Sequence, residues 1–187
     1  MTDYDVGIHD INGKQVEVEQ DLDVTDPRAD YDHVGTMVCW HGRYQLGDEQ
    51  PKEEWFDYYK REIEPHEVGG VVLPLYLYDH SGITMSTSAY SCPWDSGQVG
   101  WIYCTRKQVE EECNGDLELA KKNLEYEVLE YDQYLRGDVY TVTVYTVHEC
   151  SLGHLHREIE DSLSGLYGLE VVQDYIEDYF NEEEEVA

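Results

Sequence analysis

Basic residues are scarce in this sequence: 12 lysines and arginines stand against 42 aspartates and glutamates, giving a formal net charge of -30. A charge of this size and sign repels the phosphates of nucleic acids and anionic lipids, which argues against direct binding to either. Three interpretations of the acidity stay open. The carboxylates could form the solvated surface of a salt-adapted protein, mimic nucleic acid toward a basic host protein, or face a cationic partner or hard metal ions.

Long apolar runs are also missing, since none approaches the ~20 residues that span a bilayer. The N-terminal sequence MTDYDVGIHD is acidic rather than basic and then apolar, so we expect a soluble, intracellular protein. Five cysteines without paired spacing are typical of reduced thiols. The sequence contains no P-loop, no dinucleotide-binding fingerprint and no paired-carboxylate motif that stands out from the acidic background.

Turn residues and apolar periodicity predict one α+β domain over residues 1–187. Its sheet is expected to be mixed or largely antiparallel and built from hairpins, with three to four helices packed on it. Asn12-Gly13 favours a hairpin over residues 1–20, because both residues tolerate positive φ angles. The other predicted elements are an acidic loop over 21–32, a strand over 34–44, a helix over 51–63, a short helix after a capping box at Thr105, a helix over 116–136, a strand over 138–150 that returns over 154–159, a helix over 169–180 and a disordered acidic tail over 181–187.

The least charged and most aromatic stretch, residues 71–104, predicts a three-stranded meander with strands over 71–78, 83–90 and 98–103. Pro74 cannot donate to a strand ladder, so it requires an edge position or a bulge. Turns are expected over 79–82 and 91–97. An eight-residue strand between them spans roughly 26 Å at ~3.3 Å per residue. The two turns are therefore predicted at opposite ends of the sheet, with His80 far from Cys92.

Both turns contain residues that could carry chemistry. If the protein is an enzyme, its candidate nucleophile is Cys92, with His80, Asp79 and Asp95 as partners. The predicted separation argues against such a site and favours Asx-type turns with Trp94 packed over the sheet edge. If the stretch has a functional face, the predicted binding residues are Trp94, Asp95, Ser96 and Gln98.

Histidine and cysteine gather at one predicted hairpin end. A loop over 151–153 would place Cys150 opposite His154, and His148 opposite His156, with all four side chains on one sheet face. Imidazole and thiolate are the ligands that zinc prefers, so zinc is the predicted cofactor if there is one. Surface histidines on a partly buried hairpin are the alternative. Cys39 and His41 share a strand face and form a weaker candidate pair, because buried cysteine commonly acts as a small apolar residue.

Four segments resemble a widespread family of tailed-phage proteins of unknown function. In chain order they are VGTMVCWHGRYQLGD, PLYLYDHSGITMSTSAYSCPWDSGQVGWIY, EVLEYDQYLRGDVY and DSLSGLYG, and the resemblance covers residues 34–168. It implies a virus or provirus source and expression in the cytoplasm of a prokaryotic host, but no activity, cofactor or catalytic residue. The chain departs from the family pattern at Leu163-Ser164, where the family has Cys-Trp, at residues 148–156, which are usually acidic or contain glycine, and in its N-terminal hairpin and excess charge. The charge suggests a virus of a halophilic archaeon.

Together these observations favour a non-enzymatic interaction module that acts on a host or viral component. Anti-defence action or nucleic-acid mimicry is the most specific form of this hypothesis. A small hydrolase that depends on a cysteine or a metal is the first alternative. A virion-associated structural protein is the second.

Overall fold

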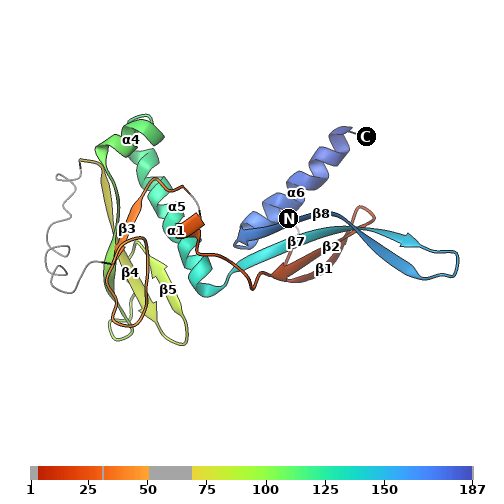
Figure 1. The fold of residues 1–187 in the computed structure, drawn as a ribbon, viewed down its shortest axis with the longest axis horizontal. Helices are drawn as coiled ribbons and strands as arrows, with labels where there is room; N and C mark the ends of the chain where they lie inside the picture. The colour runs from red at the N-terminus through yellow and green to blue at the C-terminus, as the bar shows by residue number, and fades with distance from the viewer. Residues whose placement is uncertain (1–3, 31, 51–68, 187) are drawn as a thin grey trace. The chain divides into compact units, whose positions relative to one another are not determined.

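The structure, a computed structural model, describes residues 4–30, 32–50 and 69–186, so the predicted helix over 51–63 lies outside the described residues. The chain forms two compact units. Met1–Val24 and Gly137–Ala187 together make the terminal unit, and Thr25–Arg136 make the central unit. The sequence predicts one domain, whereas each unit has a sheet and a hydrophobic core of its own (Figure 1).

The terminal unit is built on an antiparallel sheet in the order β1-β2-β7-β8. Its first hairpin joins β1 (Gly7–Ile11) to β2 (Lys14–Gln20). The turn residues Asn12 and Gly13 have φ angles of 48° and 83°, which the Asn-Gly pair accepts at little cost. The second hairpin joins β7 (Val139–Glu149) to β8 (Leu155–Tyr167). Both predicted hairpins are therefore confirmed.

Helix α6 (Leu169–Val186) covers one face of this sheet (Figure 1). Alternate residues of a strand point to the same face, and helix residues three or four apart share a stripe. The core that results contains Val16, Val18, Val142, Val144, Val172, Ile176 and Phe180. The helix continues to Val186 through the run of glutamates for which the sequence predicts a disordered tail. Glutamate is a good helix former, which accounts for the difference.

The central unit contains an antiparallel sheet in the order β3-β6-β4-β5. Its strands are β3 (Thr36–Cys39), β4 (Val71–Asp79), β5 (Ile83–Ser86) and β6 (Ser96–Cys104). The predicted meander is wrong, because β6 pairs with β4 rather than with β5. The predicted eight-residue strand after the first turn is also wrong, since β5 has four residues.

Pro74 lies in β4 where a missing donor does little harm. It is opposite Trp101 of β6, while β5 pairs only with the last four residues of β4, from Tyr76 onward. The β4–β6 register shifts between Leu75 and Tyr76, directly after the proline. A proline cannot donate to a second neighbouring strand, so it fits where that strand is absent. Within the described residues Pro74 thus has both the open strand side and the bulge that the sequence predicted as alternatives.

Three helices belong to the described part of the central unit: α1 (Pro27–Asp30), α4 (Arg106–Glu112) and α5 (Leu117–Arg136). The single turn α1 falls within the predicted acidic loop. Helix α4 begins at the predicted capping box, in which Thr105 and Gln108 satisfy each other's backbone donors. Asp116 caps α5, its carboxylate accepting from the N–H groups of Glu118 and Leu119. None of the helices in the described residues combines the length and apolar composition of a membrane span.

One face of α5 packs against the central sheet and buries most of this unit's core. Ala120, Leu124, Val128 and Tyr131 recur at helical spacing and are almost completely buried. They lie in one cluster with strand residues that include Met37, Leu75 and Ile102. The predicted helix over 116–136 and the α+β class with hairpin-built antiparallel sheets are therefore confirmed.

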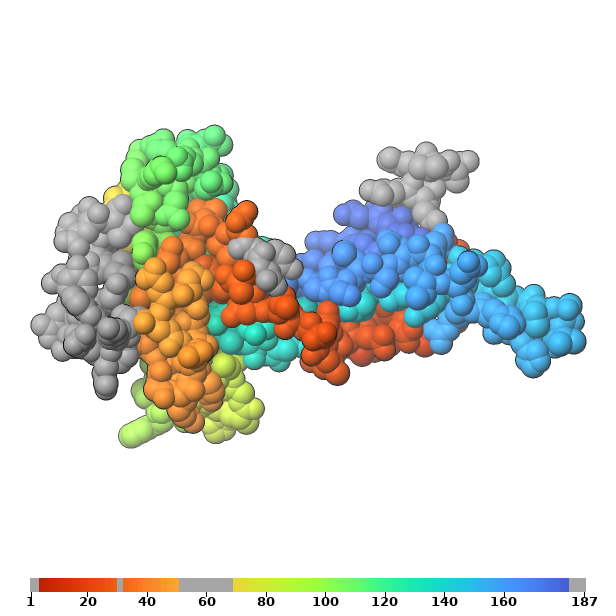
Figure 2. Space-filling view, viewed as in Figure 1, coloured from red at the N-terminus to blue at the C-terminus, as the bar shows by residue number. Residues whose placement is uncertain are grey.

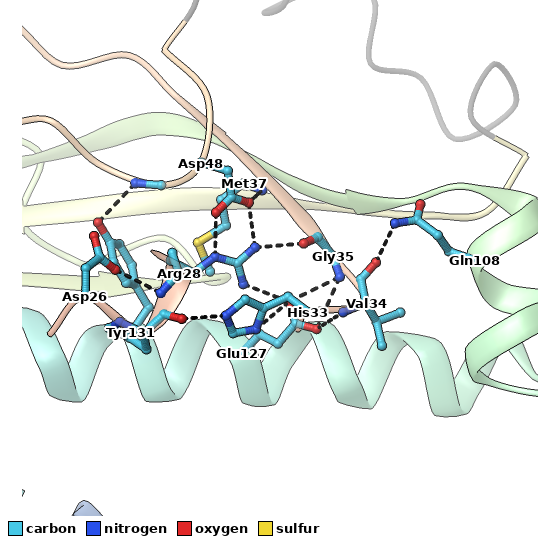
Figure 3. A network of polar contacts seen from close by, with 12 residues as sticks. Asp26, Arg28, His33, Val34, Gly35, Met37, Asp48, Gln108, Glu127 and Tyr131 are labelled. Atoms are coloured by element: carbon cyan, nitrogen blue, oxygen red, sulfur yellow. Dashed lines mark hydrogen bonds and ion pairs between the residues drawn. The ribbon is translucent and has the colours of Figure 1, made fainter. Parts of the chain in front are cut away.

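A buried charge network joins the segment before β3 to α5 (Figure 3). The Arg28 side chain is 3 % exposed, and its guanidinium lies 2.6 Å from Asp48 and 2.9 Å from Glu127. Glu127 also accepts from Val34 N at 2.8 Å, and Asp48 accepts from Met37 N at 2.7 Å. Burial alone would lower the pKa of Arg28, but its hydrogen bonds to the two carboxylates outweigh burial and raise it.

Candidate binding pocket

The candidate site lies at the end of the central sheet where β4 stops and β6 starts. Because β6 lies directly beside β4, Tyr78 of β4 is opposite Ser96 of β6. The backbone N–H of Asp79 donates to the carbonyl of Asp95 at 2.8 Å, which ties the first turn to the second. The order of the strands therefore brings together two turns that residues 83–90 separate in the sequence.

The short strand β5 makes this arrangement possible. The hydroxyl of Ser86 accepts from Ser88 N at 3.0 Å, a local turn that ends β5. Asp132 of α5 accepts from Met85 N at 2.7 Å and from the Thr84 hydroxyl at 2.5 Å, so the strand is fixed to the helix. The chain after Ser86 is then free of the ladder and returns to the same end of the sheet as residues 79–82.

The prediction that His80 lies far from Cys92 is wrong. His80 Nδ1 is 3.3 Å from Asp95 Oδ2, and Cys92 Sγ is 3.6 Å from the same oxygen. Since both atoms contact one oxygen, they lie no further apart than the sum of these two distances. The estimate from strand length failed because it assumed that residues 83–90 form one extended strand.

The contacts among Cys92, Asp95 and His80 are arranged differently from those of an activated cysteine. In a Cys–His nucleophile the thiol donates to the imidazole, and a third group orients the imidazole. Here the carboxylate of Asp95 lies in contact with both Cys92 and His80. The Ser96 hydroxyl donates to the carbonyl of Cys92 at 2.5 Å, which holds the turn closed. The geometry is that of an ordered turn around a carboxylate.

Beside this turn lies an open pocket of about 320 Å³. Trp94 stands at the pocket with 91 % of its surface exposed, so it does not pack over the sheet edge as predicted. Tryptophan is highly buried on average, and it is enriched at interfaces. The pocket is lined by His41, Arg43, Leu77, Asp79, Trp94, Asp95, Ser96, Gly97 and Val99.

The two carboxylates of the pocket, Asp79 and Asp95, differ in their partners. Arg43 forms an ion pair with Asp79, and its guanidinium lies 5.4 Å from the centre of the Tyr44 ring. His41 Nδ1 accepts from the backbone N–H groups of Arg43 and Tyr44, so this nitrogen is turned toward its own loop. Asp95 contacts only the thiol of Cys92 and the exposed His80 among the hydrogen bonds and ion pairs of the described side chains. Its carboxylate is the one available to a cation from outside.

Compared with known proteins, the chain matches no family model, no curated protein and no solved structure.

Three of the four predicted binding residues, Trp94, Asp95 and Ser96, line the pocket. The fourth, Gln98, lies outside its lining and donates to the carbonyl of Gly100 at 3.3 Å. Sequence reasoning missed Arg43, and it considered His41 only as a metal ligand. These two residues precede Trp94 by about fifty positions, and nothing in their local spacing connects them to it.

The predicted zinc hairpin has the expected pairing. His148 is opposite His156, and Cys150 N donates to the carbonyl of His154 at 2.9 Å. Backbone N–H groups of Leu152 and His154 lower the pKa of Cys150. His148 lies 3.7 Å from Glu158. Within the described residues no three His, Cys, Asp or Glu side chains are grouped closely enough to hold a metal, and zinc binding here stays a prediction.

Cys39 and His41 lie in different surroundings. Cys39 belongs to the hydrophobic core of the central unit, where burial raises the pKa of its thiol to about 12. The thiol is therefore protonated at neutral pH and packs as a small apolar group. His41 lies beyond the end of β3 and lines the Trp94 pocket. The structure thus supports the alternative role that the sequence gives to Cys39.

Proposed function

We propose that this protein is a virus-encoded accessory protein of the host cytoplasm that binds a basic segment of a host or viral protein without catalysis. The contact residues are Trp94 and Asp95, with the rest of the pocket shaping the site. The observation that carries the proposal is the exposure of Trp94, at 91 %, beside the carboxylate of Asp95. The resemblance to phage proteins supports the viral source, and the net charge of -30 supports a basic partner.

The pocket has the chemistry to bind a lysine or arginine side chain. A cation over the face of an indole gains about 0.5–1 kcal/mol at an exposed site and about 2 kcal/mol when water is excluded. The neighbouring carboxylate of Asp95 supplies a charge-assisted hydrogen bond to the same cation. Tryptophan is also enriched among the residues that dominate binding energy in protein interfaces. One exposed indole beside one carboxylate is a small but specific site.

The acidic background adds long-range attraction to this local site. Excess negative charge raises the rate at which a basic partner arrives, and salt screens that attraction over about 10 Å at 0.1 M. Phosphate mimicry would need carboxylates to replace a whole backbone. The pocket needs only one carboxylate, so the binding proposal stands apart from mimicry. Binding in the pocket requires that affinity depend on Trp94, whereas phosphate mimicry does not.

Trp94→Ala is expected to weaken binding of a short arginine-rich peptide about tenfold, because both the indole face and part of the pocket wall are lost. Isothermal titration calorimetry at about 0.15 M salt measures the change. The matched control is Tyr126→Ala, which removes another exposed aromatic of the same unit outside the pocket. Equal affinities for Trp94→Ala and the parent protein, with binding that depends on salt alone, would contradict the pocket as the site.

A cysteine hydrolase is the second candidate function, because Cys92, His80 and Asp95 lie in contact at one end of the sheet. If Cys92 is a nucleophile, it should react with iodoacetamide at pH 7 at least about tenfold faster than an ordinary thiol, and His80→Ala should remove that advantage. Mass spectrometry of the alkylated peptides gives the rate for each cysteine. Reaction of Cys92 at an ordinary thiol's rate, unchanged in His80→Ala, rules this candidate out.

A further inference from the structure

Among the described residues, strand β8 forms an open edge of the terminal sheet. It pairs with β7 on one side and is the last strand in the sheet order. Its residues 155–164 are all exposed, including Leu155 at 69 % and Ile159 at 63 %. Strand β2 pairs with β7 only as far as Thr146, so the end of the β7–β8 hairpin extends past the first hairpin (Figure 2). An exposed edge with apolar side chains is a template for pairing with another chain.

The regular part of this edge is well defined. Leu155 to Ile159 pair without interruption with Glu149 to Tyr145. The register then shifts at Glu160, which is left over between Ile159 and Asp161. Bulges of this kind end an edge's ability to accept another strand. The uninterrupted stretch is therefore five residues long, which is the length of an ordinary strand.

The hairpin turn decides which backbone groups of this stretch point outward. Cys150 N donates to the carbonyl of His154, so these two residues form a hydrogen-bonded pair. In an antiparallel ladder such pairs alternate with pairs whose N–H and C=O groups point away from each other. The backbone groups of Leu155, Arg157 and Ile159 are therefore expected to point away from β7, toward the open edge.

We propose that residues 155–159 of β8 bind an extended segment of a partner protein as an added antiparallel strand, with apolar residues on one face of the segment and lysine or arginine on the other. The apolar face would lie beside Leu155 and Ile159, which share one sheet face. The basic face would lie beside Glu158, whose side chain is 80 % exposed. Main-chain hydrogen bonds supply the affinity in this mode of recognition, and the alternating side chains supply the specificity.

A second copy of this chain fits the edge less well than a basic partner. Two copies would bring together two chains of net charge -30, which repel each other at ordinary salt. Pairing of two β8 strands over residues 155–159 would centre on Arg157 and place the two arginines opposite each other, and like charges directly opposite are destabilising. A basic segment removes both repulsions.

The probe is a peptide of about nine residues in which lysine alternates with valine, and the control peptide carries glutamate in place of lysine. Full-length protein is titrated with each peptide, and amide hydrogen exchange is followed residue by residue. The lysine peptide is expected to slow exchange at Leu155, Arg157 and Ile159 at least about tenfold. Amides of His156 and Glu158, which already face β7, should change little.

Arg157→Pro removes an outward N–H, which an edge position tolerates. This variant should weaken binding of the lysine peptide to β8 at least about tenfold. Arg157→Ala keeps the N–H and removes only the contacts with Glu17 and Tyr145. Its affinity for the lysine peptide should stay within about twofold of that of the parent protein. If Arg157→Pro also loses amide protection in β7, Ile159→Lys replaces it, with the same tenfold loss expected from charge repulsion. Peptide-induced protection of the Leu155, Arg157 and Ile159 amides should be unaffected by Trp94→Ala, so this site and the proposed pocket can fail separately.

Three results would overturn the proposal. The first is absence of peptide-induced protection at the three outward amides. The second is equal binding of the lysine and glutamate peptides, since the basic face would then have no role. The third is protection of these amides in the protein without peptide, together with a dimer in sedimentation, because the occupant would then be a second copy.

Discussion

Arg28→Met is expected to lower the free energy of unfolding of the central unit by about 3–5 kcal/mol. The substitution leaves Asp48 and Glu127 without their shared cation in a buried setting, where an unpaired charge costs most. Urea unfolding followed by tryptophan fluorescence measures it, since all four tryptophans of the sequence fall within residues 25–136.

The matched control is Arg106→Met. Arg106 also contacts a carboxylate at 2.6 Å, that of Glu110, but both side chains are more than half exposed. An exposed pair one helical turn apart contributes about 0.3–0.5 kcal/mol, so this variant should unfold almost as the parent does. Similar losses of unfolding free energy in the two variants would show that the buried Arg28 network stabilises the unit no more than an exposed ion pair does.

Removal of both charges of the buried pair should not restore stability. Replacement of a whole buried ion pair by apolar residues is often neutral, because the desolvation cost disappears together with the attraction. Glu127, however, also accepts hydrogen bonds from the backbone N–H groups of Val34 and Gly35. The double variant Arg28→Met, Glu127→Leu leaves those donors without an acceptor and Asp48 without its cation. We therefore expect it to be no more stable than Arg28→Met alone.

Gly100→Ala is expected to destabilise the central unit by about 1–3 kcal/mol or more. Gly100 lies in β6 between Cys39 of β3 and Leu75 of β4. A Cβ atom at this position would lie 2.2 Å from the carbonyl oxygen of Val38 and 3.0 Å from Cys39 Cα. Both are backbone atoms, so the contact is relieved only if β3 moves away from β6. Thermal unfolding by circular dichroism measures the loss.

Gly97→Ala is the control, because it makes the same chemical change in the same strand. A Cβ atom there meets nothing within 4 Å, and this residue is not among those with positive φ. Alanine in an open strand position restricts the unfolded chain, so Gly97→Ala should be neutral or slightly stabilising. A melting temperature for Gly100→Ala equal to that of Gly97→Ala would mean that β3 and β6 are not as close as described.

Local patterns in the sequence predicted the elements whose causes are themselves local. Asn12-Gly13 sets a hairpin because those two residues accept positive φ angles. Thr105 and Gln108 start α4 because they are spaced to cap each other, and the apolar spacing along residues 117–135 predicted α5. The α+β class with hairpin-built antiparallel sheets follows from the same local patterns.

The pocket could not be predicted in this way. Its geometry depends on β6 lying beside β4 and on β5 ending at Ser86, where α5 holds the strand through Asp132. Both facts rest on contacts between residues distant in the sequence. Trp94, Asp95 and Ser96 could be selected as binding residues from their composition, whereas His41 and Arg43 reach the pocket only through the pairing of β3 with β6.

By itself, then, the sequence determined the two hairpins of the terminal unit, the capped helices and the excess of acidic residues, because dihedral preferences, capping and composition act over a few residues. Only the tertiary structure decided the grouping into two units, the strand order β3-β6-β4-β5 and the contact of His80 and Cys92 with one carboxylate. Strand pairing depends on which distant segments bury their apolar faces together, and a one-dimensional pattern leaves several pairings open.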